Sequence, residues 1–398
     1  MAGTSARTRS AWLIGITLVL AGCSSAADSG PTTRVTTTVG SVGAGEGALT
    51  VIARPGYVED GTNDPGQDWV HPFEKATGCT VTSKVAANPD QLAEFLAAGD
   101  YDVVSAAGDI SLGLILGGAV QPINIGLVPN YRTMFPFLSD QPWNSKDGLT
   151  YGIPVGWTAN LLMSVSPAVK SAPTSWSSVF DPKSPSKGKI AAYDSPITIA
   201  DAALYLAHTQ PQLGIKSPFA LDQRQLDAVV DLLRKQRPIL GQYWTEDTTM
   251  VRGFESGDYV LGSGRQDIAD LLTADKVKVT ATVPREGTTA WSDNWMISAE
   301  AAHPNCAYKW LDWTGSAEVD AQLAKWTGQA PAQTASCQQP GMAEHCEHYH
   351  ALDENYLKAL SWWTTPTAQC LDGRADTTCV DYAGWTKAWQ SVKGPATG

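Results

Sequence analysis

The stretch that decides the fold runs from Val277 to Ser298. It reads Val277-Lys-Val-Thr-Ala-Thr-Val283, then Pro284-Arg-Glu-Gly287, and then Trp291-Ser-Asp293-Asn-Trp295-Met-Ile-Ser298. Two runs that alternate apolar and polar residues on either side of a proline–glycine turn are typical of two strands joined by a loop. We therefore expect the second strand to carry two indoles and a carboxylate within five residues.

The chemistry of this second strand favours a site for an amine. An indole face attracts a cation, and a neighbouring carboxylate adds charge and hydrogen-bond acceptors. The alternative is that Trp291 and Trp295 are core residues and that Asp293 stabilises a turn. The spacing alone leaves both interpretations open.

The bulk composition narrows the class of protein. The chain has 398 residues, of which 43% are hydrophobic, enough for two domains with a large core. Its formal net charge is −12, and no basic run longer than two residues follows the N-terminus. These features argue against nucleic acid or an anionic membrane surface as a partner.

The N-terminus has the pattern of an export signal. Arg7 and Arg9 precede an apolar run over residues 11–21, and Leu20-Ala21-Gly22-Cys23 resembles the lipobox of bacterial lipoproteins. We expect a signal peptide over residues 1–22, a lipid on Cys23, and a flexible tether over residues 23–48. The protein would then be anchored to the outer face of the cytoplasmic membrane, in the periplasm or at the cell surface, and would contact the membrane through its lipid only.

Six cysteines remain after Cys23, and an even number in an exported chain predicts disulfides. Fifteen pairings are possible, of which short separations favour Cys337–Cys346 and Cys370–Cys379, leaving Cys79–Cys306. Metal ligation is the alternative, but no CxxC motif occurs.

The first third of the folded part alternates strands and helices. Strands are expected over residues 49–53, 79–85 and 101–105, with helices over 69–77 and 91–98. This order predicts a parallel sheet, and ligands of such sheets bind outside the carboxyl ends of the strands. Those ends are Arg54 to Tyr57 and Ser105 to Asp109.

The rest of the chain continues the alternation of strands and helices. We expect a surface connection over residues 122–148, and a strand over 151–163 interrupted at Gly156-Trp157. Helices are expected over residues 199–206, 225–235, 302–314 and 318–326. Trp244 and Glu246 lie in a polar loop that could line a cleft, the alternative being an ordinary surface loop.

Seven short phrases in this order resemble the spermidine/putrescine-type solute-binding proteins of ABC importers. They are Phe73-Glu-Lys-Ala-Thr-Gly78, Tyr101-Asp-Val-Val104, Tyr151-Gly-Ile-Pro154, Thr174-Ser-Trp176, Lys187-Gly-Lys189, Phe254-Glu-Ser-Gly257 and Trp291-Ser-Asp293. The resemblance implies an α/β, two-lobed periplasmic-binding-protein-like fold with hinge-crossing strands and a ligand cleft between the lobes. We expect lobe one over residues 49–155 plus 292–336, lobe two over 156–291, and an extension over 337–398 that packs on lobe one or contributes to the cleft.

The resemblance also implies ligand-binding residues. Trp291 and Asp293 match a Trp-X-Asp that stacks on and pairs with a ligand amine. The other matching positions are Tyr57 after the first strand, Trp157 at the hinge, Asp194 in an acidic loop of lobe two, and Gln329 where the family often has a tyrosine.

Two arginines depart from the family pattern. Arg54 and Arg265 stand where the family offers tryptophans, and a guanidinium repels a cation that an indole face would attract. Two like charges 4 Å apart cost about 4 kcal/mol at an effective dielectric near 20. A solute that also carries a carboxylate suits a forked guanidinium better, which predicts a zwitterionic or anionic ligand. Alternatively, the arginines pair with Asp109, Glu246 or Asp194 as latches between the lobes.

Two further groups have open interpretations. Asp109 follows the third strand, as a functional carboxylate or as a turn-forming residue. His345-Cys346-Glu347-His348-Tyr349-His350 has a spacing that could hold a metal, but the neighbouring Cys337 favours a disulfide-pinned loop, and we predict no metal and no cofactor.

We therefore expect a non-enzymatic, monomeric receptor that delivers a small amine-bearing solute to an ABC permease and its ATPase. One alternative is a genuine spermidine or putrescine binder. Another is an exported sensor or enzyme with the same fold, although no histidine lies near a candidate nucleophile.

Overall fold

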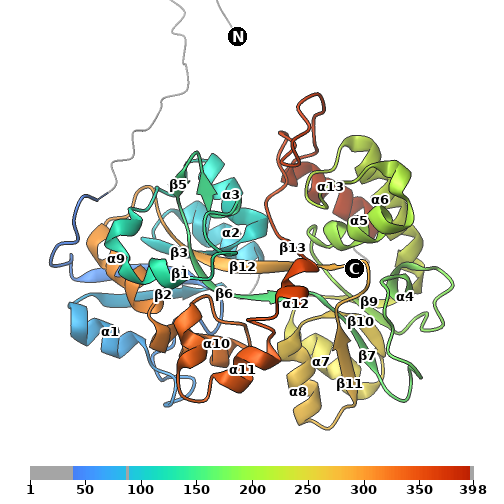
Figure 1. Cartoon of the computed structure of the whole chain (residues 1–398), viewed down its shortest axis with the longest axis horizontal. Helices are drawn as coiled ribbons and strands as arrows, with labels where there is room; N and C mark the ends of the chain where they lie inside the picture. Colours follow the sequence, from blue (N-terminus) through green and yellow to red (C-terminus); the bar gives the residue numbers. More distant parts are fainter. Residues whose placement is uncertain (1–38, 87–88, 395–398) are drawn as a thin grey trace, which may run out of the picture. The chain divides into compact units, whose positions relative to one another are not determined.

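The computed structural model describes residues 39–86 and 89–394 (Figure 1). The predicted signal peptide, Cys23 and the first part of the predicted tether lie outside these residues. Within the described part, no helix is both long and apolar enough to cross a membrane.

The first sheet gathers strands from both ends of the chain. Its order is β13 (Leu360–Trp362), β12 (Thr288–Ile297), β3 (Val103–Ala107), β1 (Ala48–Ala53) and β2 (Thr80–Val85), and β6 (Ile153–Ala159) pairs with β12. β1 is parallel to β2 and β3, as the β–α–β–α–β pattern predicts, whereas β12 is antiparallel to β3 and β6. The strand expected at Val277–Ser298 thus lies beside the parallel strands.

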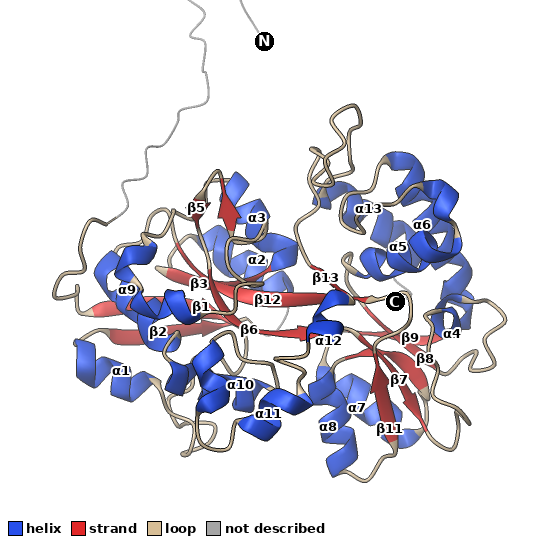
Figure 2. Cartoon of the chain, in the orientation of Figure 1, coloured by secondary structure: helices blue, strands red, loops and turns tan. Residues whose placement is uncertain are grey.

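Alternation along each strand builds two cores, one on each face of this sheet. Val51 packs with α1 (Val70–Thr77), α9 (Pro304–Thr314) and α10 (Ala317–Thr327), while the next residue, Ile52, packs with α2 (Pro89–Ala98) and α3 (Gly108–Leu116). Figure 2 shows helices around each sheet.

The second sheet has the order β11 (Val279–Thr282), β7 (Leu161–Val165), β10 (Leu261–Gly264), β8 (Ile190–Tyr193) and β9 (Leu240–Trp244). One face packs against α4 (Ser177–Phe180), α5 (Thr198–Thr209), α6 (Gln223–Gln236) and α13 (Tyr382–Lys393), and the other against α7 (Asp247–Ser256) and α8 (Gln266–Ala274). Two separately covered sheets make the two lobes of the predicted fold class, which is confirmed.

The remaining elements are short. They are β4 (Ser145–Lys146), β5 (Leu149–Thr150), α11 (Ala343–His348), α12 (Glu354–Lys358) and 3-10 turns over Ile125–Leu127, Pro129–Thr133, Pro211–Leu213, Arg237–Ile239 and Thr334–Gln338. The connection over residues 122–148 is not confined to the surface as expected, because Tyr131, Met134 and Leu138 are buried in the core of lobe one.

The chain changes sheet at places other than those predicted. β6 runs through Gly156-Trp157 without a break, and the change to β7 comes at Asn160. The return comes between β11 and β12. The predicted boundaries at 155/156 and 291/292 therefore cut through two continuous strands of the first sheet, because Gly156 does not interrupt β6 and β12 begins before Trp291.

The end of the predicted tether is bound to lobe one. The Glu46 carboxylate accepts hydrogen bonds from the backbone N–H groups of Asn305 (3.1 Å) and Cys306 (3.0 Å), at the N-terminus of α9. A carboxylate is favourable there because the first N–H groups of a helix lack partners. The expectation of a flexible tether up to residue 48 is therefore wrong for Glu46.

All three disulfides expected from the separations are present. Cys79–Cys306 spans 227 residues and ties the segment before β2 to α9, whereas Cys337–Cys346 and Cys370–Cys379 each close a nine-residue separation.

The extension after Cys337 contacts both lobes. Met342 and Cys346 belong to the core of lobe one, and β13 adds an edge strand to the first sheet. Trp385 and Trp389 of α13 instead belong to the core of lobe two. The extension therefore packs on lobe one, as expected, only in its first part, because the apolar face of α13 is buried against α6 of lobe two.

Candidate functional site

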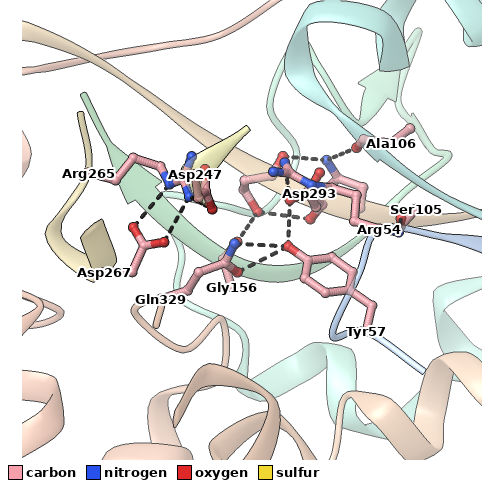
Figure 3. A network of polar contacts seen from close by, with 12 residues as sticks. Arg54, Tyr57, Ser105, Ala106, Gly156, Asp247, Arg265, Asp267, Asp293 and Gln329 are labelled. Atoms are coloured by element: carbon pink, nitrogen blue, oxygen red, sulfur yellow. Dashed lines mark hydrogen bonds and ion pairs between the residues drawn. The ribbon is translucent and has the colours of Figure 1, made fainter. Parts of the chain in front are cut away.

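The candidate site lies where β1 and β3 end against the middle of β12 (Figure 3). The backbone N–H of Arg54, the first residue after β1, donates to the Ser105 hydroxyl on β3 (3.1 Å). Asp293 on β12 pairs with Ala107, the last residue of β3. Parallel strands end at the same edge of a sheet, so the side chains of Arg54 and Asp293 meet there.

Four predicted residues form one polar network (Figure 3). An Nη of Arg54 lies 3.2 Å from Oδ2 of Asp293, and the Tyr57 hydroxyl donates to the same oxygen at 2.5 Å. The amide of Gln329 bonds to the Tyr57 hydroxyl at 3.0 Å. The network joins β1, β12 and the loop after α10, three segments that are far apart in sequence.

One oxygen of this network has no partner. Oδ1 of Asp293 makes no hydrogen bond to any residue that the structure describes, although the Asp293 side chain is only 1% exposed. The Arg54 side chain is 38% exposed, and the charge of Asp293 raises the pKa of Arg54. A buried acceptor without a partner costs free energy, so this atom is where a ligand N–H would be stabilising.

A bulge in β6 places Gln329 in the network. Two residues of β6, Val155 and Gly156, stand opposite Asp293, and Gly156 has a φ of +77°. A Cβ at Gly156 would lie 2.8 Å from Oε1 of Gln329 and 3.0 Å from the Ala330 carbonyl oxygen, so the Gln329 side chain would have to move. Glycine at position 156 therefore leaves room for the Gln329 side chain, and it tolerates the positive φ that the bulge requires.

Asp109 lies at the start of α3, beside this network. Burial first, and then the charge of Asp293, raises the pKa of Asp109 to about 6, while Arg54 opposes the shift. Tyr382 of α13 approaches the same carboxyl group: burial and Asp109 raise the pKa of Tyr382. Sequence reasoning missed Tyr382, because nothing in the tail signals its position.

Arg265 is held inside lobe two. Its Nε and Nη atoms donate to the two carboxylate oxygens of Asp267 at 3.0 and 2.8 Å, and it also pairs with Asp247 (Figure 3). Burial lowers the pKa of Arg265, but Asp267 and Asp247 more than offset this effect. The side chain is 12% exposed, so less of this guanidinium faces a ligand than that of Arg54.

The ion pairs predicted for Arg54 and Arg265 as latches between the lobes are wrong. Neither Asp109, Glu246 nor Asp194 forms an ion pair with an arginine among the described residues. Arg54 bonds to β12 and Arg265 to helices of its own lobe, because nearer carboxylates are available to each.

Tyr193 and Trp244 are the other residues of lobe two that lie near the candidate site. Their rings lie 4.8 Å apart, and the Arg265 guanidinium lies 6.0 Å from the centre of the Trp244 ring. Burial raises the pKa of Tyr193, and Arg54, Asp109 and Arg265 all influence it. Tyr193 therefore stands among charged groups of both lobes, a position that its place at the carboxyl end of β8 could have signalled.

Two predicted tryptophans are packed in cores. Trp157 is buried against Phe137 and Trp362. Trp291 is 5% exposed and stacks on Trp363 of the extension, with ring centres 4.3 Å apart. In this structure neither indole offers an open face to a ligand.

Asp194 is likewise bound by the extension. Its Oδ1 accepts the indole N–H of Trp389 at 2.9 Å, and its Oδ2 pairs with the ammonium of Lys393 at 2.6 Å. Sequence reasoning reached Asp194 but not the two side chains that cover it.

The three histidines of the segment 345–350 each contact a different partner. His345 contacts the carbonyl of Gln329 (2.7 Å), His348 pairs with Asp270 (2.8 Å), and His350 stacks on Tyr356. Within the described residues, no group of three or more metal-ligating side chains is gathered there or elsewhere.

The comparison with known families agrees with this geometry. Residues 68–350 match the family described as bacterial extracellular solute-binding proteins. The chain belongs to this family. The resemblance drawn from the seven sequence phrases, to polyamine-type solute-binding proteins of ABC importers, is thereby confirmed.

Individual members of the family are distant relatives of this chain. A putrescine/agmatine-binding protein of Pseudomonas aeruginosa is 24% identical over 274 residues, which cover 64% of this chain and 72% of that protein. The structure of the spermidine/putrescine ABC transporter substrate-binding protein PotD from Streptococcus pneumoniae covers 87% of this chain and 97% of its own, with a TM-score of 0.66 and 17% identity. The Atu4243–GABA receptor gives a TM-score of 0.63 at 16% identity, over 88% of this chain and 99% of its own.

The charges of this solute-binding protein are unbalanced around the candidate site. Two arginines, Arg54 and Arg265, are accompanied by the four aspartates at positions 109, 247, 267 and 293, a net charge of −2 when all are ionised. The arginines therefore do not make the site positive, which weakens the argument from Arg54 and Arg265 against a ligand with more than one amine.

Proposed function

We propose that this protein captures a small solute bearing one amine and one carboxylate, and presents it to an ABC permease without chemical change. The observation that carries the proposal is the unpartnered Oδ1 of Asp293 beside the half-exposed guanidinium of Arg54. A ligand ammonium would donate a hydrogen bond to this oxygen, and a ligand carboxylate would accept hydrogen bonds from the free N–H groups of the guanidinium.

The neighbouring groups support this orientation. Asp109 adds a second carboxylate on the amine side. Tyr57, which is itself held by Gln329, fixes the position of Asp293 through Oδ2 and leaves Oδ1 to the ligand. A site whose donors and acceptors are held in place before binding loses less entropy on binding.

The relatives support a nitrogen-containing solute. One is named for putrescine and agmatine, and a structural neighbour is described as a GABA receptor. GABA, 4-aminobutyrate, has an amine and a carboxylate separated by three carbons, the combination that Asp293 and Arg54 would recognise.

A diamine remains the second candidate, on a specific observation. The four aspartates around the site outnumber its two arginines, which favours an extra positive charge on the ligand. Arg54 opposes it, because a second ammonium near its guanidinium would meet a like charge.

We further propose the lipid anchor on Cys23 and the extracytoplasmic location expected from the sequence. Replacing Cys23 with serine should release the protein from the membrane fraction of the producing bacterium. A Cys23→Ser chain that stays in that fraction would contradict lipid anchoring.

Thermal unfolding with a panel of solutes tests the ligand class. A bound ligand stabilises the native state by RT ln(1 + [L]/Kd), about 2.7 kcal/mol at one hundred times Kd. The melting temperature should rise with 4-aminobutyrate more than with putrescine, cadaverine or spermidine at equal concentration. A rise with diamines alone would select the second candidate.

A further inference from the structure

The extension covers two groups that could each accept a ligand amine, and it lies beside a third. The covered groups are the indole of Trp291 and the carboxylate of Asp194, and the third is the carboxylate of Asp109; the residues of the extension that reach them all lie between Leu360 and Lys393. An indole face and a carboxylate are the protein groups that bind ammonium ions best.

The cover over Trp291 follows from strand register. β13 runs parallel to β12 from Thr288↔Leu360 to Ala290↔Trp362, and the N–H of Trp363 then donates to the carbonyl of Ala290 at 2.7 Å. The next side chains along the two strands, Trp291 and Trp363, are therefore neighbours, and their rings stack with an interplanar angle of 24°. The stack covers one face of the indole, and because Trp291 is only 5% exposed, no face is open to a second cation.

The cover over Asp194 comes from the last turns of α13. Lys393 places an ammonium 2.6 Å from Oδ2, and Trp389 donates to Oδ1. The lysine thus supplies from within the chain the kind of charge that a ligand amine would bring.

The extension also closes on Asp109. The backbone at Trp363 lies so near α3 that a Cβ on Gly108 would meet the Trp363 carbonyl oxygen at 2.1 Å. The hydroxyl of Thr365 donates to the Gly108 carbonyl oxygen at 3.2 Å. Tyr382 then approaches the Asp109 carboxyl group from α13.

We propose that residues 360–394 set the ligand specificity by occupying, with Trp363 and Lys393, the positions that a second ligand amine would need. The inference rests on the proposed function. Only the acceptors around Asp293 and Asp109 remain for an ammonium, so a solute with one amine fits and the second amine of a diamine finds no partner. The lysine contributes repulsion as well as cover, which strengthens the discrimination.

Calorimetric titration of the wild-type chain and three variants tests this inference. Lys393→Met keeps the apolar stem and removes the charge that neutralises Asp194. Lys387→Met changes an exposed lysine of the same helix and serves as the matched control. Trp363→Leu opens one face of Trp291 while leaving an apolar side chain against it, and thermal unfolding shows whether each chain is folded.

The measured quantity is the affinity for putrescine divided by that for 4-aminobutyrate. We expect this ratio to rise at least tenfold in Lys393→Met and in Trp363→Leu and to stay within twofold in Lys387→Met. An unchanged ratio in both Lys393→Met and Trp363→Leu, with the wild-type chain still binding 4-aminobutyrate, overturns the role of the extension and leaves the proposed function intact. If the wild-type chain and all variants bind neither solute, the proposed function fails and this inference fails with it.

Discussion

The Arg54 guanidinium lies 3.2 Å from the Asp293 carboxylate, although 239 residues separate them in the chain. Asp293 is fully buried and Arg54 is not, so the pair has one side toward the protein and one toward solvent. Breaking a buried ion pair is costly because it leaves a charge uncompensated, whereas a ligand that adds a donor to the carboxylate completes it. This relationship is the basis of the predictions that follow.

Asp293→Asn should weaken solute binding at least tenfold, about 1.4 kcal/mol. The variant keeps the shape of the side chain but removes the charge that attracts the ligand ammonium. Titration calorimetry measures the change. Asp100→Asn removes an exposed partner of Lys84 and should leave the affinity unaltered. An unchanged dissociation constant in Asp293→Asn would remove this residue from the site.

Arg54→Gln should change the selectivity of the site rather than abolish binding. The loss of the guanidinium removes the partner of the ligand carboxylate and relieves the repulsion of a second ammonium. Affinity for 4-aminobutyrate should fall at least tenfold while affinity for putrescine stays equal or rises. The control is Arg132→Gln, an exposed arginine of lobe one. Parallel losses for both solutes would show that Arg54 has only a structural role.

Gly156→Ala should destabilise the fold and weaken binding together. Its φ of +77° is strained for any other residue, and the new Cβ would displace Gln329 from Tyr57. Gly257→Ala provides the comparison, because Gly257 has the same φ of +77° and open space around it. Chemical denaturation should give a loss of about 1–3 kcal/mol in the free energy of unfolding for Gly156→Ala. If Gly257→Ala reduces affinity as much, the bulge does not position the site.

Asp201→Asn should flatten the pH dependence of stability. Asp201 is buried and accepts hydrogen bonds from Asn160 at the change of sheet (3.0 Å) and from Thr289 on β12 (2.7 Å). Burial raises the pKa of Asp201 from its ordinary value of 3.8 to about 7. The native state therefore binds more protons than the unfolded state between about pH 4 and pH 7, and the free energy of unfolding falls as pH rises through this interval.

Urea denaturation between pH 4 and pH 8 measures this effect. The asparagine variant should gain about 2–4 kcal/mol relative to the wild-type chain across that interval. Asp227→Asn, an exposed position on α6, should follow the wild-type curve. Equal slopes in the wild-type and Asp201→Asn chains would mean that Asp201 does not titrate in this range.

Local patterns predicted the elements of lobe one and the network well. Alternation placed the strands near Val51 and Asp293, and the rule that ligands gather at strand ends pointed to Arg54 and Tyr57. Short separations pointed to two of the disulfides and left Cys79–Cys306 as the third pair. Apart from that pair, these features depend on short-range sequence, which a single chain reveals.

Contacts between distant segments could not be predicted in the same way. Arg265 looked available for a ligand because Asp247 on α7 approaches it only when α7 and α8 pack together, although Asp267 is its neighbour in the sequence. Trp291 and Asp194 looked open because the segment that covers them begins at Leu360, far beyond both in the sequence. Register across a parallel pair of strands is set by tertiary packing, which a reading of either strand alone does not contain.

The most direct test of the account is titration calorimetry of the wild-type chain with 4-aminobutyrate and with putrescine. The two solutes are similar in length and differ in having a carboxylate or an amine at one end. The account predicts that 4-aminobutyrate binds at least tenfold more tightly than putrescine. Tighter binding of putrescine would contradict the central claim that Arg54 and Asp293 together select an amine that also carries a carboxylate.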